Sequence, residues 1–308
     1  MREVKRAVIT GATGMIGANL ARRLLREGIE VRALCRPDSP KIRNLPQDDP
    51  NLLVVPCSLS EIPALSEAPA DAWFHFGWDG VYGEARNDEA RQMKNVDYTL
   101  QALRKAVACG VMRFIFAGSQ AEYGPVSGIL SEDTPMHPVN AYGKAKKAAE
   151  EAGKRLAAEL SVDFMAARIL SVYGPYDNDY TMVMSAIHKL LRGEKPSFTK
   201  GEQIWDYLYA EDAASAMEAI MRHGKAGKSY VLGSGSGAPL SDYIEAIRDA
   251  VDPTLPLGLG EIPYAENQVM HLVADTGSIT EDTGWKAETP FSEGIRKTVR
   301  YAREKGNL

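Results

Sequence analysis

Short apolar runs alternate with longer segments of helical periodicity through the first half of the chain. The run at 7–9 is continuously apolar, which is typical of a strand buried on both faces. After it, Ile16, Leu20 and Leu24 recur at helical spacing. Strands that alternate with helices predict a parallel sheet covered by helices on both faces. The pattern predicts strands at 4–10, 30–34, 52–55, 72–76, 114–117 and 164–170, and helices near 15–27, 86–109 and 139–160.

Three glycines lie at the turn between the first predicted strand and the first predicted helix, with the spacing GxxGxxG. At such a turn the backbone N–H groups of the helix N-terminus can bind the pyrophosphate of a dinucleotide. Glycines at a strand–helix turn can also be purely structural, but this flanking pattern favours nucleotide binding. The residues assigned to the cofactor at this turn are Gly11, Thr13, Gly14, Met15, Ile16 and Gly17.

The end of the second predicted strand indicates which cofactor is bound. An acidic residue there would hydrogen-bond the ribose of NAD. This chain carries Arg36 instead, and a cation suits the 2′-phosphate of NADP. A solvated loop arginine is the alternative interpretation. The sequence therefore favours NADP, with NAD as the alternative.

A second group of polar residues predicts acid–base chemistry. The apolar strand at 114–117 leads to Ser119 at the carboxyl edge of the sheet. Tyr142 and Lys146 share one face of a predicted helix because they are four residues apart. A free tyrosine has a pKa near 10, and a nearby ammonium would lower it and make Tyr142 a usable proton donor or acceptor. Such a pair alone is often surface decoration, but beside Ser119 and the glycine turn it predicts a catalytic site.

Composition excludes several other classes. The chain has 308 residues, 44% hydrophobic and 25% charged, which is ordinary for a globular protein with a large core. A net charge of −5 gives no nucleic-acid footprint, and no stretch reaches the ~18 apolar residues of a membrane span. The widely spaced Cys35, Cys57 and Cys109 favour a reducing cytoplasm. The five histidines lack ligand spacing, so no metal is expected.

Further motifs accompany these features: Asp71 to Phe76, Asn95 to Thr99, Ser119 to Gly124, Arg168 to Pro175, Asp206 to Asp212 and Thr283 to Trp285. With them, nearly the whole chain resembles the extended short-chain dehydrogenase/reductase family, in its branch of nucleotide-sugar epimerases, dehydratases and 4-ketoreductases. The resemblance implies an α/β fold, a Rossmann doubly wound parallel sheet with a smaller C-terminal substrate-binding lobe. We expect residues 1–170 to form the NAD(P)-binding domain, with 204–233 returning to it, and 171–203 and 234–308 to form the lobe.

The resemblance also implies roles for single residues. Tyr142 would be the catalytic acid/base, Lys146 would hold the nicotinamide ribose and tune Tyr142, and Ser119 would hydrogen-bond the reacting oxygen. Asn95 would contact the cofactor or serve as a helix-packing amide. A homodimer is expected through the helices at 86–109 and 139–160. Phe76, Asn95, Tyr142 and Lys146 are also expected to bind the cofactor. The residues expected to bind the substrate are Trp78, Ser119, Gln120, Tyr142 and Trp205.

Two departures from the family pattern bear on the reaction. The dehydratases place Asp-Glu after the serine of this loop, where this chain has Gln120 and Ala121, which argues against dehydration. Trp205 stands where the family often has an arginine near the substrate diphosphate. The expected function is reduction of a nucleotide-linked 4-keto-hexose by NADPH. The alternatives are an NAD-dependent nucleotide-sugar 4-epimerase and a non-catalytic NAD(P)-sensing protein.

Overall fold

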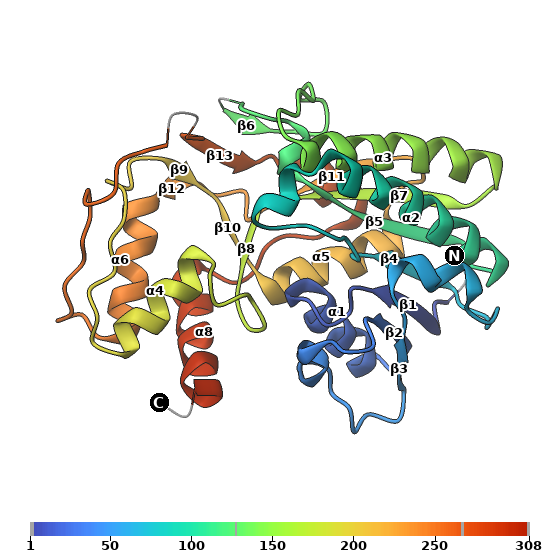
Figure 1. Ribbon diagram of the computed structural model, residues 1–308, viewed down its shortest axis with the longest axis horizontal. Helices are drawn as coiled ribbons and strands as arrows, with labels where there is room; N and C mark the ends of the chain where they lie inside the picture. The colour runs from blue at the N-terminus through green and yellow to red at the C-terminus, as the bar shows by residue number, and fades with distance from the viewer. Residues whose placement is uncertain (1–2, 127, 266–267, 307–308) are drawn as a thin grey trace.

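A seven-stranded sheet forms the larger part of the molecule in the computed structural model, which describes residues 3–126, 128–265 and 268–306 (Figure 1). Its strand order is β11-β7-β5-β4-β1-β2-β3, and each neighbouring pair is parallel. The strands are β1 (Arg6–Thr10), β2 (Glu30–Cys35), β3 (Leu52–Pro56), β4 (Ala72–His75), β5 (Arg113–Ser119), β7 (Asp163–Ile169) and β11 (Ser229–Leu232). The order changes direction between β1 and β4, which opens a crevice at the carboxyl ends of these strands.

Helices cover both faces of the sheet because successive strand residues point to opposite sides. Ala7 and Ile9 pack with α1 (Met15–Arg26), α5 (Ala210–His223) and α7 (Gly277–Thr283). Val8 packs on the other side with α2 (Glu89–Ala108) and α3 (Ala141–Glu159). The predicted fold class, a doubly wound parallel sheet of the Rossmann type, is confirmed.

One predicted helix boundary is wrong by a few residues. The helix expected from residue 86 begins at Glu89, and residues Glu84–Asn87 form a separate 3-10 turn, η3. Gly83 precedes that turn with a φ of 63°, and Asp88 caps α2 by accepting the N–H of Arg91 at 3.0 Å. A cap satisfies backbone donors at a helix start, so α2 begins after Asp88.

The rest of the chain packs beside the sheet, on the left in Figure 1. A second core is formed by residues such as Tyr173, Ile187, Ile244 and Ile295. The helices of this part are α4 (Met182–Leu191), α6 (Leu240–Val251) and α8 (Phe291–Gly306). The small strands are β6 (Ile129–Leu130), β8 (Ser171–Tyr173), β9 (Ile204–Trp205), β10 (Tyr207–Tyr209), β12 (Ala238–Pro239) and β13 (His271–Ala274), in sheets β10-β8 and β12-β9-β13-β6.

The division into a cofactor domain and a substrate lobe stays a prediction, and the ends of its ranges, 1–2 and 307–308, lie outside the described residues. Within the described chain, β11 adds a late segment to the edge of the large sheet beside β7. No helix in the described ranges is both long enough and apolar enough to cross a membrane.

Candidate functional site

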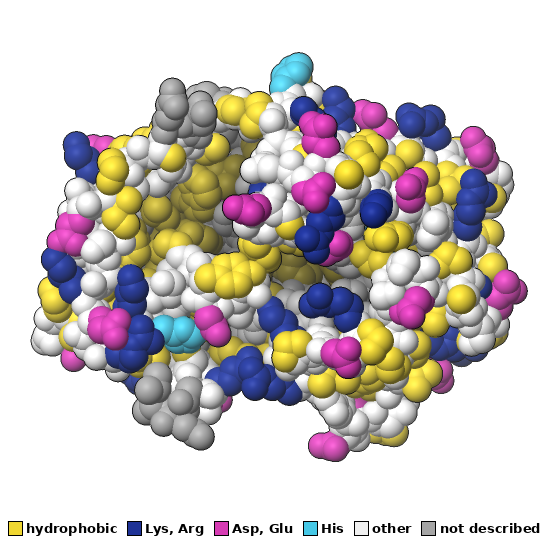
Figure 2. Space-filling view, in the orientation of Figure 1, with side chains coloured by type: hydrophobic (Ala, Val, Ile, Leu, Met, Phe, Trp, Pro, Cys, Tyr) yellow, Lys and Arg dark blue, Asp and Glu magenta, His cyan; other side chains and the backbone are white. Residues whose placement is uncertain are grey.

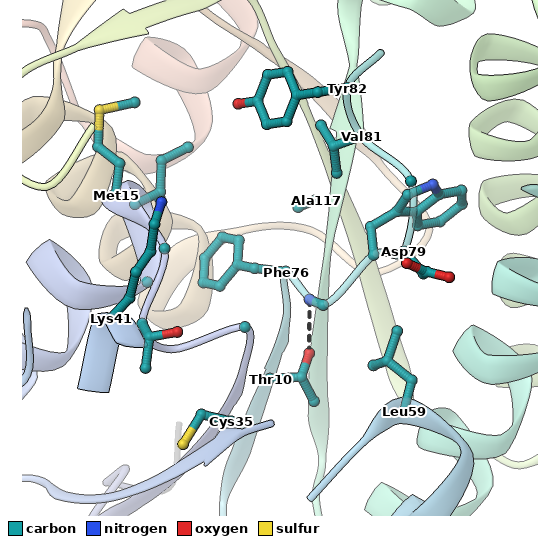
Figure 3. Close-up of a pocket in the computed structure, with 18 of the residues that line it drawn as sticks. Thr10, Met15, Cys35, Lys41, Leu59, Phe76, Asp79, Val81, Tyr82 and Ala117 are labelled. Carbon is teal, nitrogen blue, oxygen red and sulfur yellow. Dashed lines mark hydrogen bonds between the residues drawn. The ribbon is translucent and has the colours of Figure 1, made fainter. Parts of the chain in front are cut away.

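A pocket of about 940 Å³ opens at the carboxyl ends of the central strands. In Figure 3, Met15 and Lys41 lie on one side of it, Leu59 and Asp79 on the other, and Phe76 between them. Figure 2 shows this face of the molecule hollowed between its two parts, with hydrophobic side chains along the hollow. The pocket therefore lies at the crevice that the strand order opens.

The glycine turn forms one wall of the pocket. All six residues that the sequence assigns to the cofactor at this turn line it. Gly11 has a φ of 67°, which favours glycine, and a Cβ on Gly17 would lie 2.5 Å from the Gly11 carbonyl oxygen. A side chain at residue 17 would therefore push α1 away from the turn. The pocket reaches the N-terminus of α1, whose backbone N–H groups can bind a pyrophosphate.

Arg36 lines the same pocket just beyond β2. It is exposed, and its charge is one of those that lower the pKa of Asp79 on the opposite side of the pocket. Ser39 lies nearby, with its Oγ 3.3 Å from Oγ1 of Thr13. These groups form a polar, cationic end of the pocket.

A chain of side-chain contacts crosses the pocket. Lys41, on the short helix η1 (Pro40–Asn44), donates to Oδ1 of Asn178, and Nδ2 of Asn178 donates to the Tyr82 hydroxyl at 3.1 Å. Burial lowers the pKa of Lys41. The bridge joins the sheet side of the pocket to the segment before α4.

Ser119, Tyr142 and Lys146 come together in this pocket, as the sequence predicts. Ser119 ends β5, and its Oγ accepts the N–H of Ala121 at 3.2 Å. Tyr142 and Lys146 lie in the first turns of α3, and both are buried. Lys146 Nζ donates to the carbonyl oxygen of Ala117 at 2.8 Å.

The expected direction of the Tyr142 pKa is wrong for this arrangement. Burial raises the pKa of the phenol, and this outweighs the Ser119 hydroxyl and the Arg86 guanidinium, which lower it. The ammonium of Lys146 is itself desolvated, and burial lowers its pKa to about 7 although the charge of Glu122 raises it. A buried amine that loses its charge near neutrality is a weak stabiliser of a phenolate.

The loop after Ser119 places an amide, and no carboxylate, on the pocket wall. Gln120 lines the pocket. Glu122 is fully buried behind the loop, where its Oε1 accepts the Ser119 N–H at 2.6 Å. Burial and the charge of Glu150 raise the pKa of Glu122 to about 8. Glu122 therefore fixes the loop from behind.

Three aromatic or amide residues named from the sequence differ in their placement. Trp78 lines the pocket, and Lys146 Nζ lies 3.7 Å from the centroid of its ring. Asn95 does not line it, because its side chain binds the backbone N–H and carbonyl of Asp79 at 2.8 and 3.0 Å. Trp205 also lies outside it, and its indole N–H donates to Ser171 Oγ at 2.9 Å.

Two further residues line the pocket although no sequence motif predicted them. Asp177 lines the pocket, accepts from Asn178 N and Thr181 Oγ1 at 2.7 and 2.9 Å, and has a pKa that burial raises to about 6. Arg86 also lines it, from the turn η3. Neither residue belongs to a local motif, so only the fold brings it to the site.

His75 ends β4 and contacts Thr10, which lines the pocket. Its Nδ1 is 3.0 Å from Thr10 Oγ1, and Thr10 Oγ1 also accepts the Gly77 N–H at 3.0 Å (Figure 3). Burial lowers the pKa of His75 to about 3, so the imidazole is neutral. These contacts hold the end of β4 against the end of β1.

Comparison with known proteins agrees with this geometry. The NAD dependent epimerase/dehydratase family matches residues 7–233. The dTDP-glucose 4,6-dehydratase of Salmonella typhimurium is 28% identical over 180 residues, which cover 56% of this chain and only about half (50%) of the dehydratase. The UDP-arabinose 4-epimerase 1 of Arabidopsis thaliana is 25% identical over 334 residues, covering 97% of this chain and 79% of that protein.

Solved structures extend the likeness to the whole fold. The UDP-N-acetylglucosamine 4-epimerase of Methanobrevibacter ruminantium M1 superposes with a TM-score of 0.90 at 21% identity, covering 99% of this chain and 100% of that one. The UDP-glucose 4-epimerase of Thermotoga maritima gives 0.85 at 25% identity, covering 97% and 99%. The family match spans well over half of the residues and includes the glycine turn, Ser119, Tyr142 and Lys146. The chain belongs to the NAD-dependent epimerase/dehydratase family, whose related members are nucleotide-sugar enzymes.

Proposed function

We propose that this enzyme is an NADP-dependent reductase of a nucleotide-linked 4-keto-hexose, or catalyses the reverse oxidation. The observation that supports this is the single pocket in which Ser119, Tyr142 and Lys146 meet the glycine turn. A dehydratase needs acids beside the serine, whereas Gln120 lines the pocket and Glu122 is buried behind it. Redox chemistry with one proton transfer is therefore favoured over loss of water.

The residues of the pocket divide the proton chemistry between them. When bound, the nicotinamide cofactor supplies the hydride that adds to carbon 4. Tyr142 gives its phenolic proton to the carbonyl oxygen as that oxygen gains the electron pair, and Tyr142 is left as the phenolate. The Ser119 hydroxyl donates a hydrogen bond to the same oxygen. Cofactor-binding groups are expected from Gly11 to Gly17 and, in the same pocket, from Phe76 and Lys146.

A 4-epimerase is the second candidate. The similarity to UDP-arabinose 4-epimerase 1 extends over 97% of this chain. The bridge from Lys41 through Asn178 to Tyr82 also crosses the pocket, which would slow cofactor exchange. An epimerase needs a retained NAD, because it oxidises the sugar and reduces it again from the other face. A cofactor that survives purification would favour this candidate, and free exchange with NADPH would favour the reductase.

We also propose where the substrate binds and how the enzyme assembles. Residues 171–203 and 234–308 would hold the nucleotide sugar, with Trp78 on the wall and Trp205 at the remote end. A homodimer in the cytoplasm would form through α2 and α3, whose exposed surface includes Met93. Light scattering that gives a monomer mass at micromolar concentration would reject the dimer.

Replacing Arg36 should reverse the cofactor preference. We expect Arg36→Ala to weaken NADPH binding by about 10- to 100-fold, since a hydrogen bond to a charged group contributes ~1.5–3 kcal/mol. NADH lacks the 2′-phosphate, so its binding should stay the same. The measurement is titration of cofactor-stripped protein with NADPH and NADH, followed by nicotinamide fluorescence.

Arg43→Ala is the matched control, because Arg43 belongs to the same segment but does not line the pocket. It should leave both affinities unchanged. A wild-type protein that prefers NADH, or an Arg36→Ala variant that keeps its NADPH affinity, would refute the role of Arg36. Either result would make the epimerase the function to test next.

A further inference from the structure

A second cation lies against the proposed proton donor. The guanidinium carbon of Arg86 is 4.1 Å from the centroid of the Tyr142 ring, which is closer than Lys146 Nζ at 5.8 Å. Cations within about 6 Å of an aromatic face are attracted to it, and the attraction grows when water is excluded. Tyr142 is buried and Arg86 only partly exposed, so little water screens the contact.

Hydrogen bonds from the Gln92 side chain on α2 fix the loop that carries Arg86. The Gln92 side chain donates to the carbonyl oxygens of Gly80 and Ala85 at 2.7 and 2.8 Å, and its own carbonyl accepts the Trp78 indole N–H at 2.8 Å. Gly80 has a φ of 79°, and a Cβ there would lie 2.9 Å from Gln92 Nε2. The segment from Trp78 to Ala85 is thereby clamped to α2, and η3 holds Arg86 beside Tyr142.

The charge of Arg86 is not neutralised by the protein. Nη1 donates to the Val81 carbonyl oxygen at 3.1 Å, and across the described ranges Arg86 makes no ion pair with an acid. The nearby Arg91 differs in this respect, since it is paired with Asp79 at 2.7 Å. The field of Arg86 at the Tyr142 ring is therefore not cancelled by a bound carboxylate.

Lys146 lies farther from the Tyr142 ring than Arg86 does, with its Nζ 5.8 Å from the ring centroid. Its Nζ is used by the Ala117 carbonyl oxygen, and burial lowers its pKa to about 7. A guanidinium keeps its charge at every pH at which the protein is folded. Arg86 is thus the nearer cation to the Tyr142 ring, and its charge does not change with pH.

The groups that face Tyr142 come from β5, η3 and α3, from the segment 78–82 and from the turn after Ser119. Burial raises the pKa of the phenol most, Ser119 and Arg86 lower it, and the charges of Glu122 and Tyr82 raise it. Trp78 packs edge-on at 6.0 Å between ring centroids, and Lys146 lies one turn along α3. Of these neighbours, Arg86 alone carries a charge that does not depend on pH and is not balanced by an acid within the described chain.

We propose that Arg86 is a positioning residue that stabilises the Tyr142 phenolate formed when the tyrosine gives up its proton. The inference rests on the proposed function, because it takes Tyr142 as the proton donor. During reduction the negative charge that appears on the phenol oxygen is delocalised into the ring beneath the guanidinium. The same contact holds the ring in place for proton transfer.

Titration of Tyr142 tests the inference without a substrate. The near-ultraviolet absorbance of tyrosinate is followed against pH, and the curve of the matching Tyr142→Phe protein is subtracted from it. In Arg86→Met the Tyr142 midpoint should rise by about one pH unit, a tenfold change in the phenolate-to-phenol ratio. Arg86→Lys should restore most of the shift. Lys144→Met, which removes an exposed cation two residues from Tyr142, should leave the midpoint unchanged.

Turnover provides the second readout. The limb of the pH–rate profile that reports Tyr142 should move by the same amount, with kcat changed and KM for the sugar nucleotide unchanged. An unchanged midpoint in a folded Arg86→Met protein overturns the inference, as does loss of substrate binding with a normal midpoint, which would make Arg86 a substrate ligand. If Tyr142→Phe keeps its turnover, the proposed function fails, whatever the titration shows.

Discussion

Tyr142→Phe should lose about 10²–10⁴-fold in turnover, the usual contribution of a positioned general acid. The phenol is buried in the pocket beside Ser119, and the substitution removes only the hydroxyl that carries the transferred proton. Substrate and cofactor affinities should change little, because the ring remains. Consumption of NADPH with a 4-keto nucleotide sugar measures the effect on the reductase, and interconversion of two epimers measures it on an epimerase.

Tyr243→Phe is the matched control for loss of a buried tyrosine hydroxyl. Tyr243 is buried on α6, and its hydroxyl donates a long 3.4 Å hydrogen bond to the Ser236 carbonyl oxygen. The turnover of the Tyr243→Phe variant should equal that of the wild-type enzyme. If Tyr142→Phe retained normal turnover, Tyr142 would be removed from the mechanism, and with it the inference about Arg86.

Arg168→Met should destabilise the protein by about 3–5 kcal/mol, the usual cost of breaking a buried ion pair. Arg168 lies on β7 and binds both carboxylate oxygens of Glu150, at 2.7 and 3.1 Å. Burial alone would raise the pKa of Glu150, but the hydrogen bonds and charge of Arg168 hold it at about 2. Without the arginine, a carboxylate is left buried without its main partner. Urea unfolding at neutral pH measures the loss.

A second substitution separates the lost charge from lost packing. The double variant Arg168→Met/Glu150→Gln removes the buried carboxylate charge as well. Its loss of unfolding free energy should therefore be clearly smaller than the sum of the losses in the two single variants. Glu150 also influences how the stability of the wild-type protein depends on pH under acidic conditions. Its folded pKa lies below the ordinary 4.5, so wild-type stability should fall as the pH drops from about 4.5 towards 2. Strict additivity of the two substitutions would contradict the role given to the ion pair.

The alternation of strands and helices could be predicted because each element leaves a local pattern. The run at 7–9 and the spacing of Ile16, Leu20 and Leu24 locate β1 and α1 without tertiary information. The start of α2 could not be located in this way. It depends on the left-handed Gly83 and on the Asp88 cap, which interrupt an otherwise helical composition.

The candidate site was predictable only where its residues form motifs. Ser119 and the pair Tyr142 and Lys146 follow such a pattern, and the structure brings them together. Arg86 and Asp177 have no motif, since chain segments far apart in sequence carry them to the pocket. The predicted direction of the Tyr142 pKa shift was also wrong. The spacing of Tyr142 and Lys146 reveals a neighbouring amine, but it does not reveal how strongly burial desolvates both groups.

The strand β11 has a consequence for how the chain matures on the ribosome. It pairs with β7 from Ser229↔Ala166 to Leu232↔Ile169, so the edge of the large sheet is completed by residues made some sixty positions after β7 itself. Until they emerge, β7 presents a row of unpaired N–H and C=O groups on an apolar strand, the type of edge that other chains can join. A nascent or truncated chain that ends before Ser229 would therefore depend on chaperones to avoid aggregation.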